Sequence, residues 1–131
     1  MSNNDLISKT FKPGEIIVSQ GEQADTAYMI DRGKVKVYLK DGDKIVDLAE
    51  LAEDEIFGET ALFTGASYGA YVEATEETEV TLITPEILKI KMKSCDPMIR
   101  AMMQMLIERL RKTNQALLES ETREFIDIAF I

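Results

Sequence analysis

The fold is decided by the stretch Lys34-Val35-Lys36-Val37-Tyr38-Leu39-Lys40. Its apolar residues alternate with lysines and a tyrosine, so the aliphatic side chains lie on one face and the polar ones on the other, as in a strand with one buried face. Asp41-Gly42 follows and favours a tight turn. A second strand is predicted over residues 44–51. The stretch therefore predicts an antiparallel hairpin.

Further short strands are predicted on both sides of this hairpin. They cover residues 15–20, 27–31, 71–74 and 79–84, and turns at Pro13-Gly14, Gln20-Gly21 and Arg32-Gly33 separate the earlier ones. Many short strands at a spacing of about ten residues are typical of a β-sandwich or roll. We therefore expect residues 1–95 to form one mainly β unit.

The pattern changes to helical spacing after residue 84. Pro85 favours the first turn of a short helix over residues 85–93, and Asp96-Pro97 favours the start of a long helix over residues 96–124. Apolar residues in this helix recur at steps of four and three, which predicts a homodimer seam. The seam consists of Ile99, Met103, Leu106, Leu110, Thr113 and Leu117, and an adjacent stripe consists of Met98, Met102 and Met105. The alternative that both stripes pack within one subunit stays open.

Residues 125–131 form an unusually apolar tail, FIDIAFI. Exposed to water it would be an adhesive patch, so we expect it to pack on its own roll or on a partner subunit, or to cover a pocket mouth. Residues 122–131 are too few for a helix-turn-helix module, so no DNA-binding domain is expected.

Composition excludes several classes of function. The chain has 131 residues, 24 acids against 15 lysines and arginines, a net charge of −9 and no histidine. Such a surface repels nucleic acid, and histidine-based catalysis and most zinc sites are excluded. A single cysteine, Cys95, rules out an intrachain disulfide and suits the cytoplasm. We expect no membrane span, no metal, no cofactor and no enzymatic activity.

Five segments together resemble the cyclic-nucleotide-binding domain family, of the type found in catabolite activator proteins and in the regulatory subunits of cyclic-AMP-dependent kinase. They are Phe11-x-Pro-Gly14-Glu15-x-Ile, Gln20-Gly21-Glu22, Tyr28-Met29-Ile30-x-x-Gly33-x-Val35, Phe57-Gly58-Glu59-Thr-Ala61-Leu62 and Tyr71-Val72-x-Ala74. The resemblance covers roughly residues 10–120. It implies an eight-stranded antiparallel β-roll, a double-stranded jelly roll, flanked by helices.

The resemblance implies a phosphate-binding cassette over residues 57–72. Its ligand-binding positions are Phe57, Gly58, Glu59, Thr60, Ala61, Tyr68, Gly69, Ala70 and Tyr71. In the family, the position of Glu59 accepts a hydrogen bond from the ribose hydroxyl, and an arginine pairs with the cyclic phosphate. Here Tyr68 stands where that arginine belongs, and no lysine or arginine occurs between Lys44 and Lys89.

These departures lead to two hypotheses. A charged hydrogen bond contributes about 1.5–3 kcal/mol, which the neutral hydroxyl of Tyr68 replaces only in part, and the bulk of Tyr68 and Tyr71 is expected to narrow the pocket. The first hypothesis is a non-enzymatic regulatory or interaction module whose cyclic-nucleotide binding is weakened or lost, with Glu59 supporting the cassette backbone. The alternative is a working sensor of cyclic AMP, cyclic GMP or another small ligand that signals through the C-terminal helix.

Overall fold

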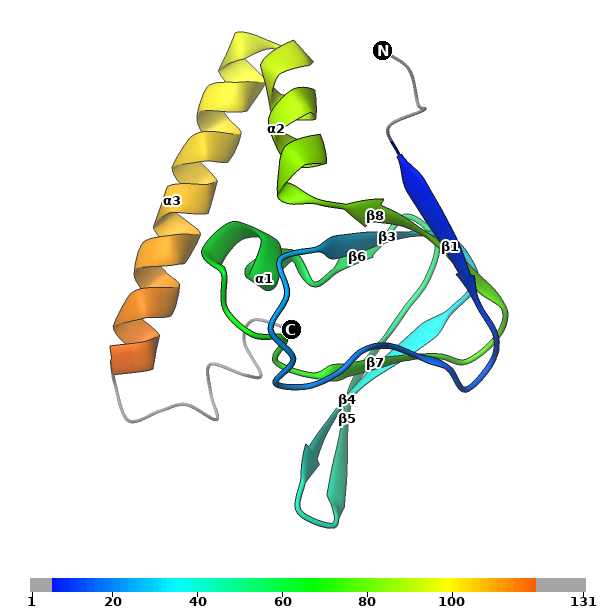
Figure 1. Cartoon of the computed structure of the whole chain (residues 1–131). Coiled ribbons are helices and arrows are strands. Elements are labelled where there is room, and N and C mark those ends of the chain that lie inside the picture. The colour runs from blue at the N-terminus through cyan, green and yellow to red at the C-terminus, as the bar shows by residue number, and fades with distance from the viewer. Residues whose placement is uncertain (1–5, 120–131) are drawn as a thin grey trace.

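Eight antiparallel strands form two four-stranded sheets in the computed structural model, which describes the backbone of residues 6–119 and the side chains of residues 6–113 (Figure 1). The first sheet has the order β1 (Ile7–Phe11), β8 (Thr78–Ile83), β3 (Ala27–Arg32) and β6 (Ile56–Phe57). The second has the order β2 (Ile16–Val18), β7 (Tyr71–Ala74), β4 (Val35–Asp41) and β5 (Lys44–Leu51). The predicted jelly roll of eight antiparallel strands with C-terminal helices is confirmed.

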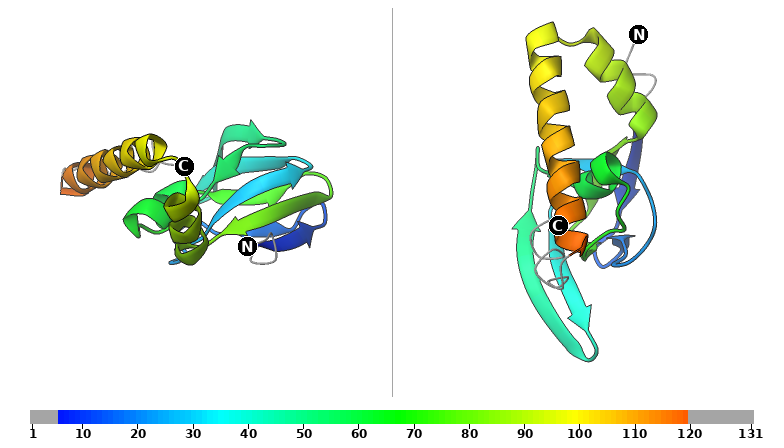
Figure 2. Two further views of the ribbon diagram at one scale, coloured as in Figure 1. Left: turned by 90° about the horizontal axis from the view of Figure 1, so that it is seen from above. Right: turned by 90° about the vertical axis from the view of Figure 1, so that its left-hand side faces the viewer.

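Strands β4 and β5 form the hairpin predicted from residues 34–51, and this hairpin points away from the helices (Figures 1 and 2). Val35 and Val37 are fully buried between the sheets, whereas Lys36 lies on the other face and is partly exposed. A bulge in the partner strand, opposite Val37 and Tyr38, shifts the register of the pair. The predicted alternation holds from Val35 to Val37, whereas Tyr38 is buried (6% exposed) and Leu39 is only partly buried.

The core lies between the two sheets and continues under the first helix. Its fully or almost fully buried members are Val18, Ile30, Val35, Val37, Phe57, Ala61, Tyr68, Ala70, Val72 and Val80. The sequence pattern does not predict two of the eight strands, β1 and β6. The residues of β1 are almost all exposed and β6 has only two residues, so neither carries a readable apolar alternation.

The turn between β3 and β4 requires a glycine. Gly33 has φ of 106°, and a Cβ there would lie 2.5 Å from Thr78 Oγ1 and 2.6 Å from the Glu77 carbonyl oxygen. Thr78 is completely buried, and its hydroxyl oxygen accepts a hydrogen bond from the Lys34 amide (3.2 Å). This close approach fixes the start of β4 against the loop that leads into β8.

Three helices complete the part of the chain that the structure describes: α1 (Glu59–Thr64), α2 (Pro85–Ser94) and α3 (Pro97–Glu119). The Asp96 carboxylate accepts from the Met98 amide (2.8 Å), as predicted for the cap of α3. Helix α2 begins at Pro85 as predicted, and the Thr84 hydroxyl caps it by accepting from the Ile87 amide (3.2 Å). None of the helices within residues 6–119 combines the length and the apolarity needed to cross a membrane.

Helix α3 packs on α1 with one face and exposes another (Figure 2). Met103, Ile107 and Leu110 are half-buried, and together with Phe63 of α1 and Leu106 they line a small depression. A second set of apolar residues in α3 is exposed to solvent, and we call it the exposed stripe: Met98, Ile99, Met102, Met105 and Leu106. Leu106 belongs to both sets because it lies at the edge of the depression.

The seam predicted from the heptad steps is thus divided between the two faces of α3. Ile99 and Leu106 are exposed, Met103 and Leu110 turn toward α1, and Thr113 is exposed. The side chain of Leu117 and the apolar tail 125–131 lie outside the described residues. Dimerisation stays a prediction.

Candidate functional site

The cassette begins where β6 passes into α1, and Gly58 makes this connection possible. Gly58 has φ of 81°, in the left-handed region, and caps the N-terminus of α1. A Cβ at this position would lie 3.1 Å from the Thr26 carbonyl oxygen and 3.2 Å from Tyr68 Cε1. The backbone of the cassette therefore packs directly against the ring of Tyr68, with no room for a side chain between them.

Tyr68 lies inside the roll and is only 5% exposed. Its hydroxyl donates a hydrogen bond to the Thr26 carbonyl (2.7 Å). Its own backbone is held on both sides, because its amide donates to the Glu22 carbonyl (3.1 Å) and its carbonyl accepts from the Gly21 amide (2.8 Å). The sequence motif Gln20-Gly21-Glu22 thus fixes the residue that replaces the arginine of the resemblance.

The groups around Tyr68 are apolar, phenolic or acidic. Burial, followed by the neighbouring Tyr28, raises the pKa of the Tyr68 hydroxyl. The pKa of Tyr28 is also raised, mainly by burial, and Glu22 adds to this effect. Tyr28 stacks on Phe57 with ring centroids 5.2 Å apart. Both phenols therefore stay neutral at physiological pH, and the ionised group that acts on both is a carboxylate.

Glu59 begins α1 with a buried carboxylate oxygen. Its Oε1 atom is the one buried side-chain polar atom of the described residues that has no hydrogen-bond partner. Burial raises the pKa of this carboxyl. An orphaned acceptor of this kind is suited to a hydroxyl donor from a ligand. No group of three or more potential metal ligands occurs among the residues that the structure describes.

Tyr71 lies on the other face of β7. Side chains alternate along a strand, so Ala70 and Val72 enter the core while Tyr71 and Glu73 point away from it. Tyr71 stacks on Tyr38 (ring centroids 5.4 Å apart), with Lys40 Nζ 5.1 Å from the centroid of its ring. The expectation that Tyr71 narrows the pocket together with Tyr68 is therefore not met.

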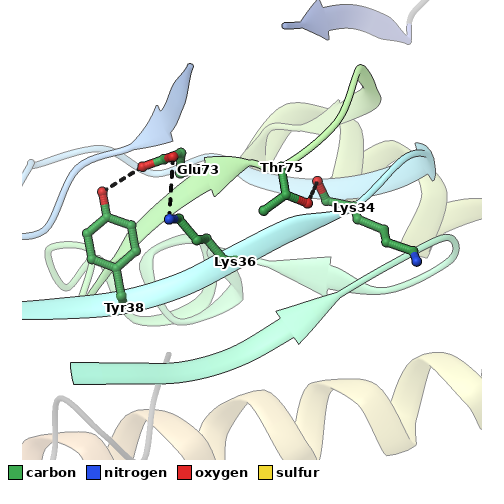
Figure 3. A network of polar contacts seen from close by, with 5 residues as sticks. All are labelled: Lys34, Lys36, Tyr38, Glu73 and Thr75. Carbon is green, nitrogen blue, oxygen red and sulfur yellow. Dashed lines mark hydrogen bonds and ion pairs between the residues drawn. The ribbon is translucent and has the colours of Figure 1, made fainter. Parts of the chain in front are cut away.

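The outer face of β7 instead holds a polar network (Figure 3). The Tyr38 hydroxyl donates to Glu73 Oε1 (3.0 Å), and Lys36 Nζ lies 3.7 Å from Glu73 Oε2. Burial and then Glu73 raise the pKa of Tyr38 to about 12. Nearby, the Thr75 hydroxyl donates to the Lys34 carbonyl (3.1 Å). These cations belong to the outside of the roll and not to the cassette interior.

The cassette positions named from the sequence are thus only partly brought together. Phe57 of β6, Ala61 of α1 and Ala70, just before β7, belong to the same buried cluster as Tyr68. Thr60 is also buried. Sequence reasoning missed Thr26, Tyr28 and Glu22 as the neighbours of Tyr68. Tyr28 and Glu22 belong to the quoted motifs, but nothing local in the sequence indicates that their chain segments meet residue 68.

Three more side-chain hydrogen bonds connect the cassette to neighbouring segments of the chain. The Gln23 side-chain amide donates to the Gly65 carbonyl (3.0 Å), and Ser67 donates to Gln23 Oε1 (3.0 Å). Arg111 Nε of α3 donates to the Phe63 carbonyl in the last turn of α1. The position of α1 is therefore coupled to the position of α3.

A comparison of the sequence with models of known protein families identifies the family of this fold. Residues 8–94 match the model of the cyclic nucleotide-binding domain. The chain belongs to this family. The cAMP-dependent protein kinase type II regulatory subunit of Drosophila melanogaster is 40% identical over 70 residues, which are 53% of this chain and 19% of that protein. The cGMP-dependent protein kinase of Plasmodium berghei is 33% identical over 90 residues, or 69% of this chain and 10% of that protein.

Two solved structures have a fold similar to that of this chain. The EAL enzyme Bd1971 in its half-site-occupied form is 32% identical, with a TM-score of 0.79 over 82% of this chain and 97% of that one. The catabolite activator protein of Thermus thermophilus is 25% identical, with a TM-score of 0.68 over 86% of this chain and 53% of that one. The chain thus spans a small part of the kinase relatives and all but a few per cent of the first structure.

Proposed function

We propose that this cyclic nucleotide-binding domain acts as a non-enzymatic regulatory and interaction module in which ordinary cyclic-nucleotide binding is weakened or lost. One observation carries the proposal. Tyr68, at the position of the family's phosphate-binding arginine, is buried and donates its hydroxyl to the Thr26 carbonyl. That hydroxyl proton is already used within the protein, so a phosphate gains neither a charge nor a free donor from it.

Electrostatics support the same conclusion. An arginine–phosphate pair is charge-assisted, and its loss costs about 1.5–3 kcal/mol, or about 10- to 150-fold in affinity. The exposed Glu22 raises the pKa of both Tyr28 and Tyr68, and Glu59 begins α1, so acidic groups surround the position where an anion would bind. Burying a phosphate without a countercharge adds a further desolvation cost.

A working sensor is the second candidate, and Glu59 is the observation that favours it. The unpartnered Oε1 atom matches the acceptor that the family uses for a ribose hydroxyl. The similar EAL enzyme Bd1971 has been solved in cAMP-bound and cGMP-bound forms. A sensor of this kind would require Tyr68 to leave its buried position.

Titration of three proteins with cyclic AMP and cyclic GMP distinguishes the two candidates. We expect millimolar or weaker binding for the native chain and a gain of at least about tenfold for Tyr68→Arg. Tyr71→Arg is the matched control, because it adds the same charge on the outer face and should change nothing. Micromolar binding by the native chain would refute the proposal whether or not Tyr68→Arg folds.

We further propose that the module forms a homodimer through the exposed stripe of α3. A soluble surface seldom leaves so many large apolar side chains of one helix in water: Met98 is 70% exposed and Leu106 59% exposed. Met102→Glu with Leu106→Glu is expected to give a monomer in analytical ultracentrifugation. Gln104→Glu, on the side of the same helix that faces the groove with α1 and α2, is expected to leave the dimer intact. A monomeric native chain would contradict this proposal.

A further inference from the structure

A groove is lined by residues of α1, α2 and α3. The axes of α2 and α3 diverge from the turn at residues 95–96, and α1 lies between their open ends (Figures 1 and 2). The groove has a volume of about 510 Å³. Its apolar lining comes from all three helices: Leu62, Phe63, Leu88, Met92 and Ile107.

Cations surround this apolar floor. Lys89 and Lys93 come from α2, Arg100 and Arg111 from α3, and Glu108 is the one acid among the lining residues that the structure describes. The chain as a whole has 24 acids and 15 lysines and arginines, so four cations against one acid reverse its overall balance at this place. The groove is therefore complementary to an occupant that is apolar on one side and acidic at its edges.

The cations are placed along the groove, and two of them are held in position. Arg100 Nη1 donates to the Lys93 carbonyl at the end of α2 (3.3 Å), and Arg111 Nε donates to the Phe63 carbonyl at the end of α1. Eleven residues of helix separate these two arginines, which is about 16 Å. Lys89 and Lys93 are exposed and one turn apart on α2.

We propose that this groove docks an acidic amphipathic helix of about three turns from a partner protein. Such a helix presents apolar residues at steps of three and four to the floor and carboxylates to the rim. A nucleic acid backbone would not use the apolar floor, and an uncharged helix would not use the four cations. The inference rests on the proposed role as an interaction module and names the chemistry of the partner.

Selection of random peptides displayed on phage against the full chain tests the proposal. The expected winners carry acids around apolar residues at spacings of three, four and seven, and become helical when bound. Their affinity should fall at least tenfold for Lys89→Glu with Lys93→Glu. Lys9→Glu with Lys44→Glu makes the same change of net charge on exposed positions of the roll and should leave the affinity unchanged.

Two results would overturn the inference. One is the absence of enriched peptides, as expected if a second copy of the chain or residues 120–131 of the same chain fill the groove. The other is enrichment of peptides that lack acids or that bind the lysine variant as tightly as the native chain. Cyclic-nucleotide titration reports on the cassette interior alone, so micromolar cyclic AMP binding would refute the proposed function while peptide docking at the groove could still be observed.

Discussion

Tyr68 and Tyr71 are three residues apart in the same cassette, yet their environments are opposite. Tyr68 is 5% exposed, packs on Gly58 and donates to a backbone carbonyl. Tyr71 stacks on Tyr38 on the outer face of the second sheet, with a lysine above its ring. The difference arises because β7 alternates its side chains between the core and the outside. A residue's place in a motif therefore does not decide whether it belongs to the pocket.

The comparison is tested most strongly by removing each ring. Tyr68→Ala leaves a cavity and an unpaired carbonyl, so we expect it to lower the free energy of unfolding by about 3–5 kcal/mol. Tyr71→Ala removes a partly exposed ring, and its loss should be about 1 kcal/mol. Urea denaturation of both variants measures the contrast, and equal losses would contradict the difference in burial.

The contact between Gly58 and Tyr68 gives a second test. Gly58→Ala places a Cβ 3.2 Å from Tyr68 Cε1 and forces a left-handed backbone on alanine, so we expect a loss of about 2–3 kcal/mol. Gly65→Ala is the control, since Gly65 has φ of 75° but no atom within 4 Å of the new Cβ. It should cost about 1–2 kcal/mol in the same urea titration. A larger loss for Gly65→Ala would mean that the close packing on Tyr68 is absent.

The hydroxyl of Tyr68 is expected to have a smaller effect than its ring. Tyr68→Phe removes the donor to the Thr26 carbonyl and should destabilise the fold by about 1–2 kcal/mol. Thermal unfolding followed by circular dichroism measures this loss. If Tyr68→Phe is as stable as the native chain, the hydroxyl is not held by Thr26 and remains free for a ligand.

Glu59 predicts a small effect that depends on pH. Its pKa is raised in the folded state, so the native protein binds a proton more readily than the unfolded chain, and its stability falls as the pH rises from the ordinary value of 4.5 through the raised one. Glu59→Gln removes this penalty. The variant should be more stable than the native chain at pH 7 and equally stable below about pH 4.

Denaturation at these two pH values tests the sign. A Glu59→Gln variant that is less stable at pH 7 would show that the ionised carboxylate has a partner and supports the cassette. That result would favour the interpretation of Glu59 as a structural residue.

Much of the fold follows from local patterns in the sequence. The alternation in residues 34–40 and the Asp41-Gly42 turn predict the hairpin of β4 and β5, and Pro85 and Asp96-Pro97 mark the starts of both C-terminal helices. Strand β1 could not be predicted in this way, because its sequence ISKTF has no continuous apolar face and its residues are almost all exposed. It is held in the sheet by its pairing with β8. Pairing between segments that are distant in the sequence produces no pattern that can be recognised in the local sequence.

For the cassette too, some features could be predicted from the sequence and others could not. Its place and its missing arginine could be identified from the sequence, because they depend on motif spacing. The direction of Tyr71 and the meeting of Thr26, Tyr28 and Tyr68 depend on how three distant segments fold together. The division of α3 into a face on α1 and an exposed stripe likewise depends on where α1 lies.

We infer that the Tyr68 ring occupies the position where a phosphate would bind, and that its hydroxyl is already hydrogen-bonded to the Thr26 carbonyl. Isothermal titration of the native chain with cyclic AMP at pH 7 tests it most directly, with the chemical environment of the Tyr68 ring followed by NMR in the same samples. We expect millimolar or weaker binding and an unchanged Tyr68 signal. Micromolar binding accompanied by displacement of the Tyr68 ring would contradict it.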